Sequence, residues 1–147
     1  MRDFTITIDI DAPPARVWAV MADVERWHEW TASITKVVLL DRGPLRIGQR
    51  ARIKQPGFPR ALWTVTELEE GRRFTWVSPT PGMVAIGRHE VIPRNGGSRA
   101  TLAVRFDGPL GGIVGRLMRN VNNRFLSLEA NGLKARSERT FPQGNQQ

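Results

Sequence analysis

The side chains best suited to proton transfer are two histidines, in a chain of 147 residues that contains neither cysteine nor tyrosine. A neutral imidazole donates or accepts a hydrogen bond, and it can serve as a general base near neutral pH. His28 stands within the segment Trp27–Trp30, where we expect a surface turn and no chemical role. His89 falls in an alternating strand pattern and is the candidate for ligand contact or acid–base chemistry. The competing interpretation is a buried histidine bonded only to the protein.

Other catalytic and metal-binding patterns are weak. A two-residue turn at Glu70–Gly71 would place Glu67 opposite Phe74, which makes Glu67 the one carboxylate that faces inward. Because Glu67 is close to the turn, we interpret it as a rim residue paired with an arginine. Two distant histidines without cysteine make a poor metal site, so we expect no metal and no cofactor.

A glycine cluster precedes the last apolar segment of the chain; it consists of Gly108, Gly111, Gly112 and Gly115. No Lys-Ser or Lys-Thr follows, so the cluster is not a phosphate-binding loop. Each glycine weakens a helix by about 1 kcal/mol relative to alanine. We therefore interpret the cluster as the mobile start of a helix that could gate a cavity.

Basic residues outnumber acidic ones, 22 to 14, and the formal net charge is +8. Such an excess is typical of proteins that bind a nucleic acid or another acidic surface. However, no five basic residues are consecutive, and only Arg50, Arg52 and Lys54 alternate along one expected strand face. We therefore favour a solvated basic exterior over a nucleic-acid interface. No apolar run approaches the 18 residues of a membrane span, the N-terminus has no signal-peptide pattern, and the absence of cysteine favours the cytoplasm.

Strand patterns that end in one long helical pattern must position these side chains. We expect strands at residues 4–10, 34–40, 49–54, 61–68, 73–78, 83–92 and 98–106. Residues 14–23 have a helical apolar side, and a short helical turn follows them. Because successive strands are joined by short turns, the sheet should be antiparallel.

From Leu110 to about Lys134, apolar side chains recur with the helical period. They are Leu110, Ile113, Val114, Leu117, Met118, Val121, Phe125 and Leu128. Such a helix would be roughly 37 Å long, so its apolar stripe needs a wide surface to cover it. We expect sheet and helix to form a single domain over residues 1–137, followed by a polar, disordered tail at 138–147.

A turn at Asn95–Gly96 would place His89 opposite Leu102 and turn a row of mostly small residues toward the long helix. Small residues under a helix leave space, so we expect an apolar cavity there. Its expected ligand-binding residues are Trp30, Trp63, Trp76, Ala85, His89, Leu102, Val104, Met118, Val121 and Phe125. Trp30 and the loop at residues 56–59 should lie at the mouth. The competing interpretation is that the tryptophans and methionines simply fill the space.

Several segments together resemble the START-like helix-grip proteins of the SRPBCC superfamily, in the polyketide cyclase/dehydrase branch. They are a strand followed by DAPPARVW (residues 11–18), then residues 23–30, 67–76, 87–90 and 96–102. The resemblance covers roughly residues 3 to 137. It implies an α+β fold in which a curved seven-stranded antiparallel sheet wraps around the C-terminal helix, with two short helices after the first strand. It also implies a cavity for lipids, polyketides or quinones.

Three functions stay open at this point. The first is binding of a small hydrophobic ligand, with or without weak catalysis, which we favour. The second is a polyketide cyclase/dehydrase-type enzyme that uses His89 as acid or base. The third is an RNA- or ribosome-associated module that uses the basic exterior. The sequence is compatible with a monomer or a homodimer.

Overall fold

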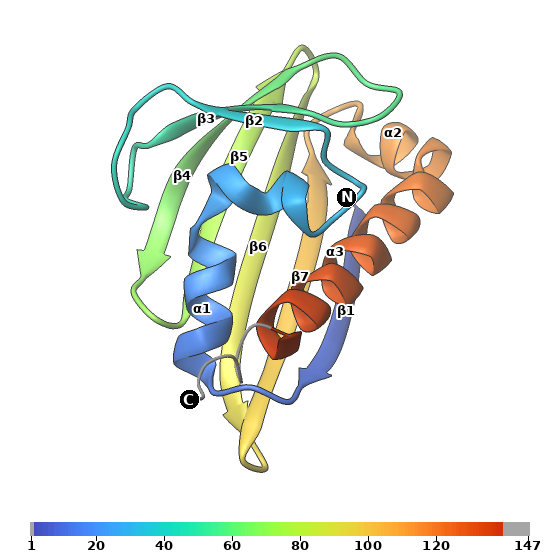
Figure 1. Cartoon of the computed structure of the whole chain (residues 1–147). Helices are drawn as coiled ribbons and strands as arrows, with labels where there is room; N and C mark the ends of the chain where they lie inside the picture. The colour runs from blue at the N-terminus through green and yellow to red at the C-terminus, as the bar shows by residue number, and fades with distance from the viewer. Residues whose placement is uncertain (1, 140–147) are drawn as a thin grey trace.

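The structure, a computed structural model, describes residues 2–139, which form one sheet and the helices that cover it (Figure 1). The strands are β1 (Arg2–Ile10), β2 (Lys36–Leu39), β3 (Arg50–Lys54), β4 (Ala61–Glu69), β5 (Arg73–Thr80), β6 (Met83–Arg94) and β7 (Gly97–Asp107). The helices are α1 (Pro14–Ala22), the 3-10 helix η1 (Val24–Glu29), α2 (Gly111–Leu117) and α3 (Arg119–Arg139).

All seven strands pair antiparallel, in the order β1-β7-β6-β5-β4-β3-β2. The helices α1 and α3 pack against each other and lie on one face of this curved sheet, with α3 across β1 and β7 (Figure 1). This arrangement confirms the expected helix-grip fold of the α+β class. Among residues 2–139, no helix is both long enough and apolar enough to cross a membrane.

The β6–β7 hairpin has the register expected from its turn. Asn95 and Gly96 have φ angles of 46° and 82°, the left-handed pair that a two-residue hairpin turn requires. His89 consequently lies opposite Leu102. Since side chains alternate between the faces of a strand, this register places His89 on the side of the sheet that α3 covers.

The β4–β5 hairpin differs from expectation at one point. Trp76 does lie opposite Val65, but the pairing shifts between Val65 and Glu67, so that Glu67 lies opposite Thr75. A bulge adds one residue and exchanges the faces beyond it. Glu67 is therefore exposed and makes no ion pair within residues 2–139, and its expected inward orientation and arginine partner are wrong.

The C-terminal helix is broken where one continuous helix was expected. Met118, with φ −99° and ψ 12°, separates α2 from α3. The expected apolar stripe is consequently wrong in its first half, because Leu110, Ile113 and Leu117 are 45%, 59% and 76% exposed. The buried positions of the second half are Leu126, Ala130, Leu133 and Ser137. Their spacing of four, three and four residues defines a different face from the one expected.

The end of α3 extends beyond the expected boundary near Lys134. Glu138 accepts hydrogen bonds from the Asp11 backbone N–H at 2.7 Å and from the Lys134 ammonium at 2.6 Å. The first bond joins the last turn of α3 to the connection between β1 and α1, and the second lies within α3. Glu138 and Arg139 therefore belong to the helix, and the rest of the tail expected at 138–147 lies outside the described residues.

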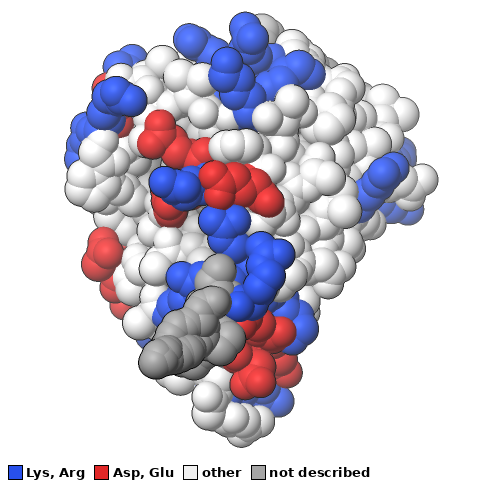
Figure 2. Space-filling view, in the orientation of Figure 1, with Lys and Arg blue, Asp and Glu red and all other residues white. Residues whose placement is uncertain are grey.

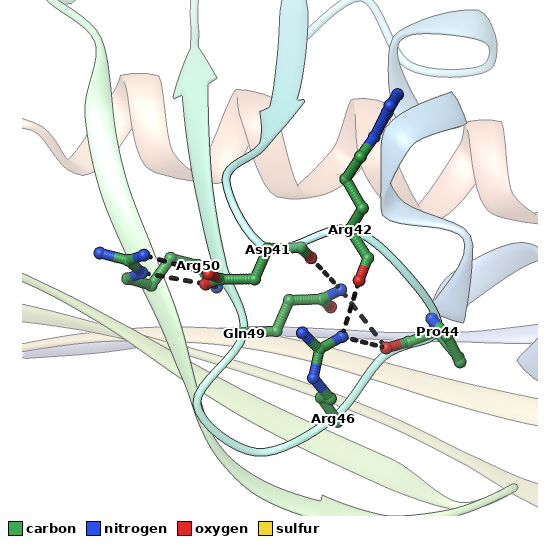
Figure 3. Close-up of polar contacts among 6 residues, drawn as sticks. All are labelled: Asp41, Arg42, Pro44, Arg46, Gln49 and Arg50. Carbon is green, nitrogen blue, oxygen red and sulfur yellow. Dashed lines mark hydrogen bonds and ion pairs between the residues drawn. The ribbon is translucent and has the colours of Figure 1, made fainter.

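The β2–β3 loop is held by a polar network (Figure 3). The Arg50 guanidinium donates to both carboxylate oxygens of Asp41, at 2.9 and 3.0 Å, and holds the pKa of that carboxyl down to about 2. The Gln49 side-chain amide donates to the Asp41 carbonyl at 2.9 Å, and Arg46 donates to the carbonyls of Arg42 and Pro44. The Arg42 side chain itself extends away from this network.

Candidate functional site

A cavity of about 430 Å³ lies between the sheet and the first half of α3. Its floor comes from β4 to β7, and its rim comes from the β3–β4 loop, the β5–β6 turn and α2. Pro59 and Thr80 line the cavity and are exposed, so the mouth lies between these two loops. The volume is in the range of small-molecule binding sites in proteins.

The structure brings together eight of the ten residues expected to bind a ligand. Those on the cavity wall are Trp63, Trp76, Ala85, His89, Leu102, Val104, Met118 and Phe125. Trp30 is not on the wall: its ring packs on Trp27 at 5.8 Å, and a Cβ on Gly132 would overlap its carbonyl oxygen. Val121 is also absent, because the phase of α3 turns the next residue, Asn122, to the cavity instead. Of the expected mouth loop, Phe58 and Pro59 reach the wall.

An aromatic cluster forms the closed end of the cavity. Trp27, which was not expected there, is 2% exposed and donates its indole N–H to the Met21 carbonyl at 3.0 Å. Its ring lies 5.2 Å from the rings of both Trp76 and His89. A Cβ at Gly87 would lie 2.9 Å from the Trp76 indole nitrogen, so a larger residue at this strand position would displace the Trp76 ring.

His89 is neutral at physiological pH. Burial lowers the pKa of His89 to about 4, against a smaller opposing effect of the Phe74 carbonyl. Its ring stacks on Phe74 at 4.3 Å, and Nδ1 lies 3.4 Å from the Phe74 carbonyl oxygen, a long hydrogen bond. A carbonyl only accepts, so the proton sits on Nδ1 and Nε2 is an acceptor. Nε2 has no hydrogen-bond partner in the described part of the chain.

Glu129 is a cavity residue that the sequence analysis missed. Loss of hydration raises the pKa of Glu129 to about 7, although Ser33 lowers it by donating to the carboxylate at 3.4 Å. The Ser33 hydroxyl is held in turn by Thr31 at 2.7 Å. The pKa of the Glu129 carboxyl is therefore shifted toward neutral pH, the range that suits a proton donor or acceptor.

Asn122 is the second missed residue. Its Nδ2 is buried without a hydrogen-bond partner among residues 2–139, and its side chain lines the cavity. An unsatisfied buried donor costs about 1–3 kcal/mol. Asn122 and Glu129 share one face of α3 with Leu126 and Leu133, at spacings of four, three and four. The apolar spacing in the second half of α3 was therefore a signal for both residues. A helix phase fitted to that half would have turned both toward the cavity.

The site therefore offers mostly apolar walls and a few polar groups on opposite sides. One wall contributes the His89 acceptor, α3 contributes the Asn122 donor and the Glu129 carboxyl, and Arg60 adds a positive charge at the rim. This arrangement can enclose an apolar molecule and bind a carbonyl or hydroxyl group on it. It also brings two groups capable of proton transfer to one cavity.

Solved structures share this fold. A Streptomyces aromatase/cyclase is 20% identical over 95% of this chain and 94% of its own, with a TM-score of 0.76. A Thermus thermophilus protein is 19% identical over 92% of this chain and 97% of its own, with a TM-score of 0.76. A START superfamily protein from Mycobacterium smegmatis is 16% identical over 92% and 97%, with a TM-score of 0.71.

At these identities the structures establish the fold alone, and no curated protein matches the sequence. The sequence itself matches one family over residues 1–138, nearly the whole of the described chain. That match agrees with the helix-grip fold and with the resemblance found in the sequence. The chain belongs to the family described as polyketide cyclase / dehydrase and lipid transport.

Proposed function

We propose that the chain binds one small, mainly apolar molecule of the lipid, polyketide or quinone type in the cavity under α3. The observation that carries this proposal is an apolar cavity of about 430 Å³ that is lined by Asn122, whose buried Nδ2 has no hydrogen-bond partner among residues 2–139. Transfer of an apolar ligand from water to these walls is favourable, at roughly 25 cal/mol for each Å² buried. A ligand carbonyl that accepts from Asn122 would also remove the cost of the unsatisfied amide.

The polar groups define the kind of ligand expected. Neutral His89 presents Nε2 as an acceptor for a ligand hydroxyl, and Asn122 presents a donor for a ligand carbonyl. A molecule with both groups on one apolar frame, such as a hydroxyquinone ring system, would satisfy the two walls together. A fully saturated hydrocarbon would satisfy neither.

The experiment uses the tryptophans of the cavity wall as reporters. Purified protein is titrated with a fatty acid, a naphthoquinone and a hydroxyanthraquinone, and tryptophan fluorescence is followed. Ala85→Phe should fill the cavity and abolish the change, because Ala85 is buried on the wall. Ala19→Phe, on the exposed side of α1, is the matched control and should bind as the wild type does. Equal binding by both variants would contradict a ligand site in this cavity.

A second candidate is a cyclase-type enzyme. It is favoured by the pKa of Glu129, raised to about 7 by burial, on the same cavity as His89. A structural neighbour described as an aromatase/cyclase is consistent with it. His89→Ala separates the two candidates: a carrier should lose about fivefold in affinity, whereas an enzyme should lose turnover a hundredfold or more. The RNA-associated function, the cytoplasmic location and the oligomeric state stay predictions.

A further inference from the structure

The helix α2 presents an apolar surface to solvent beside the cavity mouth. Leu110, Ile113 and Leu117 are 45%, 59% and 76% exposed. The same helix turns Val114 to the cavity, and Met118 follows it on the wall. Solvent-exposed and cavity-lining apolar side chains thus border each other at the rim. An exposed apolar group of this kind is a mark of an interaction surface.

A cationic groove lies on the outer face of β2 and β3 and reaches the rim of the mouth at Arg60. It has a volume of about 190 Å³ and is lined by Lys36, Val38, Arg52, Lys54 and Arg60. Lys36 lies directly opposite Lys54 in the β2–β3 pair. Like charges directly opposite each other destabilise a sheet. Arg60 lines both the groove and the ligand cavity, so the two hollows adjoin.

No carboxylate neutralises this groove in the part of the chain that the structure describes. Lys54 donates only to backbone carbonyls, those of Gln55 and Phe58, at 2.9 and 2.5 Å. By contrast Arg50, two residues before Arg52 on the same strand face, is paired with Asp41 at 2.9 Å. The cations of the groove are thus free to bind an external anion.

Figure 2 shows a group of Lys and Arg at the top of the molecule, where β2 and β3 lie in Figure 1, without Asp or Glu among them. A smaller basic group appears at the right, near α2 and the start of α3. The surface between the two groups is free of charged side chains in this view. Basic groups on both sides of an uncharged surface, with Arg60 at the rim of the mouth, match the layout of an interfacial membrane-binding surface.

We propose that this end of the molecule docks on an anionic lipid surface. The groove cations bind headgroup phosphates. The side chains of Leu110, just before α2, and of Ile113 and Leu117 in α2 enter the boundary between headgroups and acyl chains. The cavity mouth then faces the lipid, so an apolar ligand could pass between membrane and cavity without crossing water. This inference goes beyond ligand binding, since docking does not require the cavity to be occupied.

A lipid surface fits these observations better than RNA does. Phosphates of either partner could occupy the groove. However, an RNA backbone offers no apolar surface against which three exposed aliphatic side chains could pack. Juxtamembrane cations contribute about fivefold each to partitioning onto anionic membranes. Burying one large aliphatic side chain contributes about tenfold or more. The two surfaces together therefore suffice for reversible attachment.

The test is flotation of the purified full chain with vesicles of phosphatidylcholine alone or mixed with phosphatidylglycerol. Binding should require phosphatidylglycerol and should fall as salt is raised, because exposed charges are screened. Arg52→Gln should lower partitioning about fivefold, and Leu117→Asp about tenfold or more. The matched controls are Arg42→Gln and Ile47→Asp in the β2–β3 loop, at the far end of the hairpin. Arg42 has no ion pair in the described chain and Ile47 is 63% exposed, so both variants should bind within twofold of wild type.

Three results would overturn the proposal: no binding to phosphatidylglycerol vesicles, equal binding to neutral ones, or equal losses in test and control variants. Tight binding to single-stranded poly(U) that Arg52→Gln weakens, with vesicle binding unaffected, would also overturn it in favour of RNA. The variant Ala85→Phe distinguishes a failure of membrane docking from a failure of ligand binding. That variant should float as wild type does even though its cavity is filled.

Discussion

Replacement of Asn122 by leucine tests the site through the stability of the protein without ligand. The Nδ2 of Asn122 is buried with no partner among residues 2–139, which costs about 1–3 kcal/mol. Leucine has the same number and branching of side-chain heavy atoms and no polar group to satisfy. Asn122→Leu should therefore raise the free energy of unfolding by about 1–2 kcal/mol, which corresponds to roughly 3–6 °C in Tm.

The control for this prediction is Asn123→Leu. Asn123 is the next residue of α3 and is exposed, so its replacement reports the difference in helix propensity alone, a few tenths of a kcal/mol. Thermal unfolding of wild type and both variants, without ligand, gives the comparison. If Asn122→Leu is no more stable than Asn123→Leu, the reasoning about the unsatisfied amide is refuted.

The same variant should bind ligand less well although it is more stable. A ligand carbonyl loses its donor, so affinity for a quinone should fall by about tenfold. Affinity for a matched hydrocarbon should stay the same or rise. Isothermal titration with this pair of ligands separates the hydrogen bond from the apolar contact. Equal losses for both ligands would mean that leucine blocks the cavity and does not report on the amide.

Further predictions concern charge and packing. Burial raises the pKa of Glu129 from 4.5 to about 7, so the folded state holds more protons than the unfolded one between these values, and stability should fall as pH rises through that window. Glu129→Gln should flatten this part of the stability–pH curve and be about 1–2 kcal/mol more stable than wild type above pH 7, as followed by chemical denaturation. Gly132→Ala should lower the free energy of unfolding by about 2 kcal/mol or more, because the new Cβ would overlap the Trp30 carbonyl. Asn131→Ala, at the exposed neighbouring position, should not lower it, and thermal unfolding of the two variants gives the comparison. Glu67→Gln should stay within about 0.5 kcal/mol of wild type in the same assay, since the bulge turns Glu67 to solvent.

The sequence by itself determined the features that depend on local chemistry. Asn95 and Gly96 favour a left-handed two-residue turn, and that turn alone places His89 opposite Leu102 and on the face under α3. The alternation of Phe4, Ile6, Ile8 and Ile10 likewise predicts β1, because the period of a strand is set by its own backbone. Both inferences hold because the residues that decide them are neighbours in the chain.

Only the tertiary structure decided where these local patterns are interrupted. The bulge before Glu67 and the break at Met118 each exchange which side chains face inward, and neither has a mark in the local pattern. The break leaves Leu117 in solvent and turns Asn122 and Glu129 to the cavity, so the polar half of the site follows from how α3 packs on the sheet. A periodic spacing of apolar residues predicts that a helix has one buried face. Once the helix is interrupted, packing against distant strands determines which side chains form that face.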